Sequence, residues 1–213
     1  MPGTTVGSQR VPAFLVATVL TGCALLGFVV GGLIGTAGEG GGGDDEAPAS
    51  SDVLWEGPVA PVVATVAEAS CQSDASRDAN GDQVTYEPAF AVDDDSESAW
   101  RCPGDGAGER LVLDLGGSVQ VAEVGLVPGY AKTDPADNSD RYAENRRITA
   151  VRWHFDDGTT IEQELDPDAT LRDPQTLRLA PRATERLVLE ILASSDAPRD
   201  TVAVSDLRIA SSA

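Results

Sequence analysis

The sequence has few of the side chains from which enzymes most often build an active site. Its 213 residues include a single histidine, His154, and three cysteines. The chain contains no P-loop, no GxSxG sequence and no HExxH sequence, and nothing singles out a catalytic pair among its 35 acidic residues. We therefore expect no enzymatic activity and expect His154 to be an ordinary surface residue.

Positive charge is also scarce. Fifteen Lys and Arg residues against 35 Asp and Glu residues give a net charge of −20, and Lys132 is the only lysine. A protein this acidic is repelled by phosphate backbones and by anionic lipid headgroups, which argues against nucleic acid as a partner. Hydrophobic residues make up 41% of the chain, which is enough for a folded core, and the length accommodates one domain with short extensions.

Charged residues are absent from residues 11–35. As a helix, this segment would be about 37 Å long, whereas the hydrocarbon core of a membrane is about 30 Å thick. It is also longer than the apolar part of an ordinary signal peptide, about 7–15 residues. Because Arg10 precedes it, the positive-inside rule places residues 1–10 in the cytoplasm. We expect a single-pass transmembrane helix at 11–35 in the plasma membrane, with the rest of the chain extracytoplasmic.

A lipid anchor is the alternative. The residues that end at Cys23, Leu-Thr-Gly-Cys, resemble a bacterial lipobox, in which cleavage before the cysteine gives a lipoprotein. The residues after Cys23 stay apolar up to Gly35, which favours the spanning helix. Both alternatives place the remainder of the chain outside the cell.

The next segment cannot form a core. Residues 36–52 read TAGEGGGGDDEAPASSD, a composition typical of flexible tethers. Pro58 and Pro61 mark the transition to a more apolar sequence. We therefore expect a linker at 36–61 and one folded domain at 62–213.

Short apolar stretches separated by turn signals indicate that this domain is all-β. The expected strands are residues 110–115, 119–127, 148–155, 159–165, 176–179, 186–192 and 202–209. No segment of any length has the period of a helix, so we predict an antiparallel β-sandwich or jelly roll.

Residues 148–155 show the alternation most clearly. Val151, Trp153 and Phe155 would share the buried face of this strand, with Arg152 and His154 on the other face. The following Asp-Asp-Gly at 156–158 predicts a hairpin turn, because glycine adopts the positive φ that such turns require. We expect Trp100, like Trp153, to be a core residue.

Two of the three cysteines, Cys71 and Cys102, lie in the predicted domain. Outside the cell such a pair is most simply a disulfide. It would close a loop of about 30 residues and stabilise the fold by roughly 3–4 kcal/mol. The alternative is a pair of free buried thiols.

Three fragments resemble the discoidin or coagulation factor 5/8 type C family, which has a galactose-binding-like jelly roll. They are YEPAFAVD at 86–93, DDDSESAW at 93–100 and VSDLRI at 204–209. Further fragments resemble the bacterial NAD-glycohydrolase translocation branch, the NADase-type glycan-binding domain: GYAK at 129–132, NRR at 145–147, FDDG at 155–158, Leu165-Asp166 and Gln175. The resemblance covers about residues 62–211 and implies a β-sandwich that binds glycans.

The resemblance also implies a structural Ca²⁺ in the acidic loop. Its ligands would be Asp93, Asp95, Ser98 and Asp206, because Ca²⁺ prefers six to eight oxygen ligands. Asp206 stands where the family has Glu, and Asp94 stands where it has Gly, a position that calls for positive φ. The alternative is a solvated acidic turn in which Asp side chains cap backbone N–H groups.

A long polar stretch between two strands holds the candidate ligand-binding residues. Loops of this length are often functional. Tyr130 or Tyr142 could stack on a sugar face, and Arg141, Asn145 or Arg146 could hydrogen-bond its hydroxyls. The alternative is that Tyr130 packs at a strand end while the arginines pair with neighbouring acids.

These observations predict a membrane-anchored extracytoplasmic binding module on the bacterial cell surface. Its partner would be a carbohydrate or another cell-envelope component. The alternative function is a protein-interaction or accessory scaffold of the envelope that binds no glycan, because a fold does not determine a function.

Overall fold

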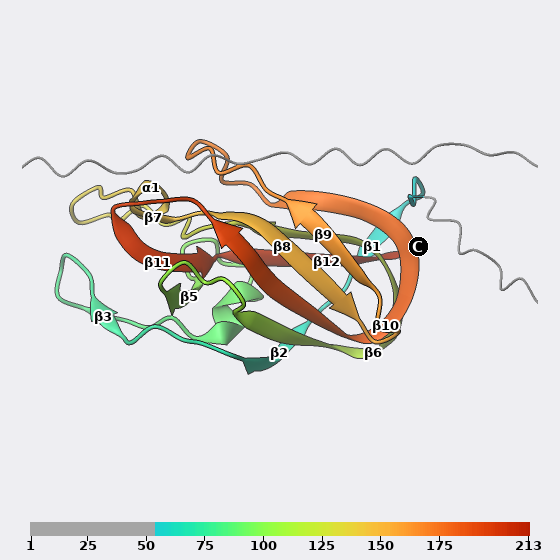
Figure 1. Cartoon of the computed structure of the whole chain (residues 1–213). Coiled ribbons are helices and arrows are strands. Elements are labelled where there is room, and N and C mark those ends of the chain that lie inside the picture. Colours follow the sequence, from blue (N-terminus) through green and yellow to red (C-terminus); the bar gives the residue numbers. More distant parts are fainter. Residues whose placement is uncertain (1–53) are drawn as a thin grey trace, which may run out of the picture. The chain divides into compact units, whose positions relative to one another are not determined.

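The computed structural model describes residues 54–213 (Figure 1). The predicted transmembrane segment 11–35, Cys23 and most of the predicted linker lie outside the described residues. Within residues 54–213, no helix has the length and apolar character needed to span a bilayer.

The domain is an all-β sandwich. Its larger sheet has seven strands in the order β1-β12-β6-β10-β8-β9, with β2 paired to β6. These strands are β1 (Val59–Pro61), β2 (Thr65–Ala69), β6 (Arg110–Val127), β8 (Ile148–Phe155), β9 (Thr160–Glu164), β10 (Gln175–Ser194) and β12 (Asp206–Ser212). All the pairings in this sheet are antiparallel, as the alternating pattern predicts.

The second sheet has three strands and lies toward one end of the molecule. It contains β5 (Trp100–Pro103), β11 (Arg199–Val204) and β7 (Asn145–Arg146). A separate two-stranded hairpin is formed by β3 (Ser76–Arg77) and β4 (Gln83–Val84). The short helices are η1 (Pro88–Ala91) and α1 (Arg141–Glu144).

The core lies between the two sheets and combines side chains from both. Trp100 and Val202 come from the small sheet, and Trp153 and Leu189 come from the large one. Each buried tryptophan also finds an acceptor: Trp100 Nε1 donates to Cys71 O at 2.9 Å, and Trp153 Nε1 donates to Gln163 Oε1 at 3.0 Å. Both tryptophans are therefore core residues, as predicted.

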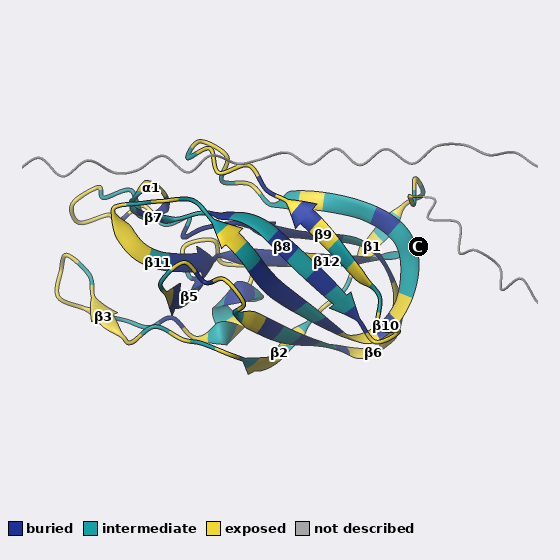
Figure 2. Ribbon diagram, in the orientation of Figure 1, coloured by how far each residue is buried: buried dark blue, intermediate teal, exposed yellow. Residues whose placement is uncertain are grey.

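Strand β8 confirms the predicted alternation. Val151 and Trp153 are fully buried, and Phe155 is 5% exposed. Arg152 and His154 lie on the other face, and Figure 2 shows buried and less buried positions alternating along β8. The hairpin turn follows at 156–158, where Gly158 has φ of 80°.

Two strands are longer than the sequence indicates. The predicted break at Gly116-Gly117 is absent: β6 continues through both glycines, which have φ of 73° and 152°. Likewise, the strands predicted at 176–179 and 186–192 are one strand, β10, with register shifts at Arg178/Arg182 and Thr184/Arg186. Glycines and register shifts bend these strands without ending them, and Figure 1 shows the bend of β10.

The strand predicted at 202–209 is instead two strands. β11 belongs to the small sheet and β12 to the large one, and the buried Ser205 separates them. The fold also begins before the predicted boundary at residue 62. β1 pairs with β12, and the backbone N–H of Trp55 donates to Leu179 O at 3.2 Å. Residues 54–61 thus belong to the sandwich.

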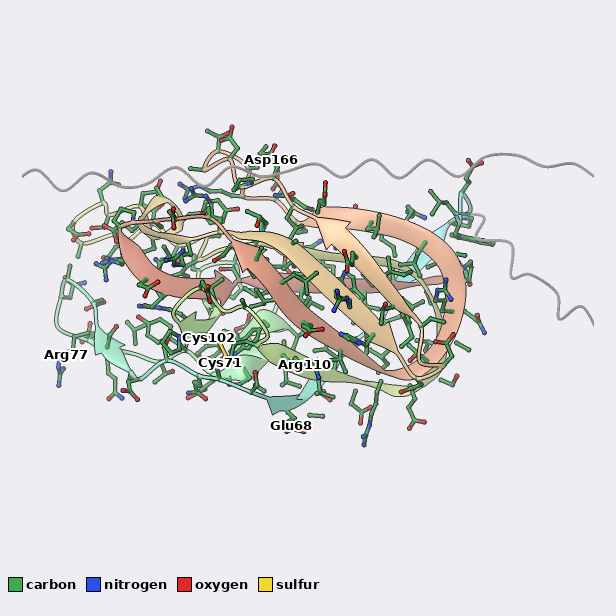
Figure 3. The ribbon with its side chains drawn as sticks, in the orientation of Figure 1. Glu68, Cys71, Arg77, Cys102, Arg110 and Asp166 are labelled. Atoms are coloured by element: carbon green, nitrogen blue, oxygen red, sulfur yellow. A yellow bond between two sulfur atoms is a disulfide. The ribbon has the colours of Figure 1, made fainter. Side chains whose placement is uncertain are left out.

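The predicted disulfide is present. Cys71 and Cys102 are bonded, with their Cα atoms 5.6 Å apart and a sequence separation of 31 (Figure 3). Cys102 is 1% exposed and belongs to the core, so the bridge ties the segment after β2 to the small sheet.

Candidate ligand pocket at one end of the sandwich

The loop between β6 and α1 is held by its own polar side chains. Asp134 is 1% exposed, and its carboxylate accepts a hydrogen bond from Arg141 Nη2 at 2.8 Å. This contact holds the pKa of Asp134 below its usual range. At the start of α1, Asp140 Oδ1 accepts from the backbone N–H groups of Tyr142 and Ala143, each at 3.1 Å. These contacts give the predicted polar stretch a defined shape.

Tyr142 is a packing residue of this loop. Its side chain is fully buried, and its hydroxyl donates to Leu171 O at 2.8 Å. A Cβ atom at Gly129 would lie 2.6 Å from Tyr142 Cε2, so only glycine allows the chain to approach the ring this closely. The structure gives no sugar access to Tyr142, which the sequence analysis names as a stacking residue.

A pocket of about 270 Å³ lies beside this loop. On one side it is lined by the β3–β4 hairpin and the residues near it: Ser76, Arg77, Asp78, Ala79, Val84 and Tyr86. On the loop side it is lined by Tyr130, Lys132, Asp134, Asp137, Ser139 and Arg141. Arg101 of β5, Asn145 of β7 and Arg199 of β11 complete it. These elements lie together at the left end of the sandwich in Figure 1.

The aromatic part of the pocket is a small second core. The rings of Tyr86 and Tyr130 meet edge to face, with centroids 6.1 Å apart, and Ala99 and Ala203 pack with them. Tyr130 is 4% exposed, and its burial raises its pKa to about 12, so its hydroxyl stays protonated at neutral pH. The Tyr130 ring is too buried for a sugar face to stack on it. The hydroxyl of Tyr130 is therefore the group of this residue that suits a ligand.

The structure brings three of the five predicted ligand-binding residues, Tyr130, Arg141 and Asn145, to one pocket. Asn145 is 1% exposed, and its Nδ2 donates to Arg141 O at 2.6 Å. Arg146 does not line this pocket. Its guanidinium instead contacts Asp200 at 2.7 Å and Asp196 at 3.3 Å. The sequence analysis gives pairing with neighbouring acids as the alternative for the arginines, and Arg146 makes contacts of that kind.

Several pocket residues do not appear among the sequence candidates. Arg77, Arg101 and Arg199 come from strands that the sequence pattern does not place beside the loop. Lys132 has a sequence signal, since it is the only lysine of the chain and is the first residue of the predicted polar contact stretch.

The acidic loop contains a network of short-range hydrogen bonds. Asp93 Oδ1 accepts from the backbone N–H of Asp95 at 3.0 Å, and Asp93 Oδ2 accepts from Ser98 Oγ at 2.7 Å. Asp95 Oδ1 accepts from the N–H of Glu97 at 2.9 Å. Asp94 has φ of 60°, the positive value that the family glycine predicts for this position. These are the contacts of a capped acidic turn.

Asp206, the fourth predicted calcium ligand, is paired with an arginine. Its Oδ2 lies 3.0 Å from Arg208 Nε and 2.8 Å from Arg208 Nη2, while its buried Oδ1 has no hydrogen-bond partner among the described residues. The buried Oδ1 of Asp206 could accept a metal cation. Oδ2 is less suited to a metal, because the Arg208 guanidinium already occupies it. In the described part of the chain, no three His, Cys, Asp or Glu side chains gather as a metal site. The Ca²⁺ site therefore stays a prediction.

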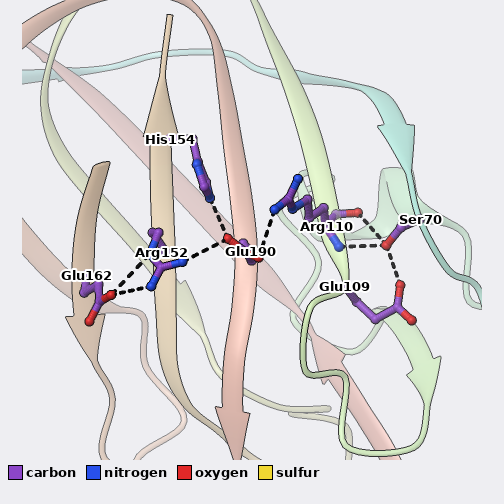
Figure 4. A network of polar contacts seen from close by, with 7 residues as sticks. All are labelled: Ser70, Glu109, Arg110, Arg152, His154, Glu162 and Glu190. Carbon is purple, nitrogen blue, oxygen red and sulfur yellow. Dashed lines mark hydrogen bonds and ion pairs between the residues drawn. The ribbon is translucent and has the colours of Figure 1, made fainter. Parts of the chain in front are cut away.

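His154, expected to be an ordinary surface residue, is partly buried in a network of polar contacts outside the pocket. Its Nε2 lies 2.7 Å from Glu190 Oε2, and Glu190 also contacts Arg110 at 3.0 Å and Arg152 at 3.5 Å (Figure 4). The serine drawn in the same network, Ser70, contacts Glu109 and Arg110. Ser70 and His154 are therefore not in contact, and they do not form the nucleophile–base pair of a hydrolase.

The two-sheet sandwich with loops gathered at one end is the architecture of discoidin-like domains. Residues 63–210 match the NAD glycohydrolase translocation F5/8 type C domain, and the chain belongs to this family. The match confirms the resemblance seen in the sequence. No curated protein matches the chain.

Solved structures include similar sandwiches. One is the family 32 carbohydrate-binding module of Clostridium perfringens NanJ in complex with galactose: it is 13% identical, the match covers 72% of this chain and 99% of that one, and the TM-score is 0.50. Another is CpGH89CBM32-5 from Clostridium perfringens in complex with GalNAc-β-1,3-galactose: it is 16% identical, the match covers 70% and 99%, and the TM-score is 0.49. At 13% identity, the likeness to the NanJ module shows a shared fold alone.

Proposed function

We propose that the sandwich is a carbohydrate-binding module and that the end pocket holds a sugar. The observation that carries the proposal is the pocket itself. Its volume, about 270 Å³, is just below the range for sites that hold drug-sized ligands, about 300–1,000 Å³, which suits a ligand as small as one sugar ring. Its lining combines hydroxyl, amide, guanidinium and carboxylate groups, which are the donors and acceptors that sugar hydroxyls require.

The fold supports the same function. The NanJ module was solved with galactose and shares this architecture at a TM-score of 0.50. Loops at one end of a β-sandwich are a common place for recognition, because a rigid scaffold positions them. Here the loop of Lys132 and Arg141 and the β3–β4 hairpin provide that end.

The placement of the pocket suits a tethered module. The described chain enters the sandwich at β1, which lies at the other end from the β3–β4 hairpin and α1 (Figure 1). A tether attached before β1 would leave the pocket end free to meet a ligand.

We also propose that the chain is membrane-anchored with residues 62–213 outside the cell, on the length of its uncharged segment. Carbonate extraction of membranes and protease treatment of intact cells test this proposal. The expected result is a protein that resists extraction and loses its C-terminal domain to external protease. A Cys23→Ser variant that leaves the membrane fraction would support the lipid anchor, and a wild-type protein found in the cytosol would contradict both anchors.

A glycan array probed with the full-length protein tests the proposed function. Ala79 is exposed and lines the pocket, so Ala79→Trp would fill part of it with a large ring. Ala183 is exposed on β10 and does not line the pocket, so Ala183→Trp is the matched control. We expect a glycan signal for the wild type and the control and a strongly reduced signal for Ala79→Trp. Absence of any glycan signal, or equal signals for all three proteins, would contradict the proposal.

A further inference from the structure

The pocket has the opposite charge to the rest of the protein. Five cationic side chains line it: Arg77, Arg101, Lys132, Arg141 and Arg199. They are five of the 15 Lys and Arg residues in a chain of net charge −20. Three carboxylates, Asp78, Asp134 and Asp137, also line the pocket, so the lining has a formal charge of 5 − 3 = +2. Glu144 is not part of the lining but pairs with Arg141 and Arg199, which lowers the local sum to +1. An acidic protein that concentrates its cations at one site creates a local field that attracts anions.

Two of the five cations are already neutralised by the protein. Arg141 pairs with Asp134 at 2.8 Å and with Glu144 at 2.9 Å. Arg199 pairs with the same Glu144 at 3.0 Å. These pairs order the wall of the pocket.

The other three cations, Arg77, Arg101 and Lys132, have no ion pair within 4 Å among residues 54–213. Lys132 is nonetheless near enough to Asp134 to help lower the pKa of that carboxyl. Arg77 Nη1 donates to Gly81 O at 2.6 Å, which orients the guanidinium and leaves its charge uncompensated. Arg101 places its Cζ 4.5 Å from the centroid of the Tyr86 ring, and its buried Nε has no hydrogen-bond partner among the described residues. Two carboxylates, Asp78 and Asp137, also lack an ion pair, but both accept backbone N–H groups.

A neutral sugar can accept hydrogen bonds from these groups but does not compensate their charge. Cations that share one pocket repel one another, and an anionic ligand would reduce that repulsion. Arginine suits such a ligand because its planar fork can bind a carboxylate or phosphate through two parallel hydrogen bonds. Arg101 is the best placed for this, since its guanidinium is held over the Tyr86 ring, with Cζ 4.5 Å from the ring centroid.

We infer that the pocket recognises an acidic saccharide, a sugar that carries a carboxylate or another anionic group. This inference rests on the proposed function and specifies the class of sugar. The anionic group would lie against Arg101 and Lys132, and the ring hydroxyls would meet the remaining polar groups of the pocket.

Isothermal titration of the full-length protein tests the inference with three sugars that differ only at carbon 6: galactose, galacturonic acid and galactose 6-phosphate. We expect at least one acidic sugar to bind about tenfold or more tightly than galactose, the size expected of charge-assisted hydrogen bonds. The preference should weaken as NaCl is raised, because salt screens the attraction. Preference for galacturonic acid or for galactose 6-phosphate would show which anionic group the pocket selects.

Lys132→Gln tests the origin of the preference. We expect the ratio of acidic-sugar to galactose affinity to fall toward one in this variant. Arg186→Gln, an exposed residue of β10 that does not line the pocket, makes the same change in net charge and should keep the wild-type ratio. Equal binding of all three sugars by the wild type would overturn the inference and leave the proposed function standing. Absence of binding by any sugar, here and on the array, would overturn both.

Discussion

The guanidinium of Arg101 lies over the ring of Tyr86, with 4.5 Å between Arg101 Cζ and the ring centroid. The same ring meets Tyr130 edge to face, and its hydroxyl lies 2.7 Å from Ser76 Oγ. Tyr86 is therefore held on several sides and in turn orients the cation. An aromatic face stabilises the guanidinium without cancelling its charge, which leaves that charge available to a ligand.

Replacing Arg101 by lysine separates geometry from charge. Arg101→Lys keeps the positive charge but loses the planar fork and most of the stacking on Tyr86. We expect the affinity for the preferred acidic sugar to fall about threefold or more, measured by isothermal titration. Calorimetric melting of the same sample checks that the variant is folded. An unchanged affinity in a folded variant would show that Arg101 is not a ligand contact.

The disulfide should be a major contribution to stability. The bond between Cys71 and Cys102 spans 31 residues, and the loop-entropy relation gives a stabilisation of roughly 3–4 kcal/mol. We expect reduction with dithiothreitol, or the double variant Cys71→Ala and Cys102→Ala, to lower the free energy of unfolding by about this amount. Denaturant titration of the full-length protein measures it. A loss below about 1 kcal/mol would contradict the entropic estimate.

Glu190 makes stability depend on pH. Burial raises the pKa of Glu190, but hydrogen bonds from Arg110 and His154 outweigh the burial, and the net shift is downward. A lowered pKa in the folded state means that the stabilisation is fully present above the usual carboxyl pKa and is lost as the pH falls through the folded value. The network of Figure 4 should therefore weaken in acid.

We expect Glu190→Gln to lower the free energy of unfolding at pH 7 by about 1–3 kcal/mol, because the carboxylate receives charged hydrogen bonds. The gap between wild type and variant should narrow as the pH falls below the ordinary glutamate pKa, about 4.3, and close below the lowered pKa of Glu190. Glu162 pairs with Arg152 at 2.6 Å, but its side chain is 60% exposed, so Glu162→Gln is a control with an expected effect below about 1 kcal/mol. A gap that does not change with pH would contradict this account of Glu190.

Arg208 is the cation that the structure places on Asp206. We expect Arg208→Ala to lower the free energy of unfolding by about 1–3 kcal/mol, since it leaves a buried carboxylate unpaired. If Asp206 acts with Asp93, Asp95 and Ser98 as a calcium site, millimolar CaCl₂ should raise the melting temperature, and more in this variant than in the wild type. Melting temperatures that respond to neither CaCl₂ nor chelator in either protein would contradict the calcium prediction.

The sequence predicts the local parts of the fold well. Val151, Trp153 and Phe155 alternate with Arg152 and His154, and an alternation of period two is typical of a strand with one buried face. Gly116-Gly117 wrongly predicts a break between two strands, because glycine can either end a strand or bend it. Only the pairing of β6 with β10 on both sides of the glycines shows that the strand bends and continues. The division at Ser205 is hidden similarly, because both neighbouring segments are apolar.

The candidate site is predictable only in part. Sequence position puts Tyr130 and Tyr142 in one polar loop, but Tyr142 packs inward, where its ring lies close to Gly129 and its hydroxyl donates to Leu171 O. Arg77 and Arg101 reach the pocket from distant segments. No local pattern contains that information, because the sandwich brings these strands together.

A crystal structure of the protein with galacturonic acid, or with whichever of the three sugars binds most tightly, tests the central claim most directly. The account predicts the sugar in the pocket beside Tyr130, with an acidic group within hydrogen-bond distance of Arg101 or Lys132. A sugar bound elsewhere, for example over the Glu190 network on the large sheet, with the pocket empty, would contradict it.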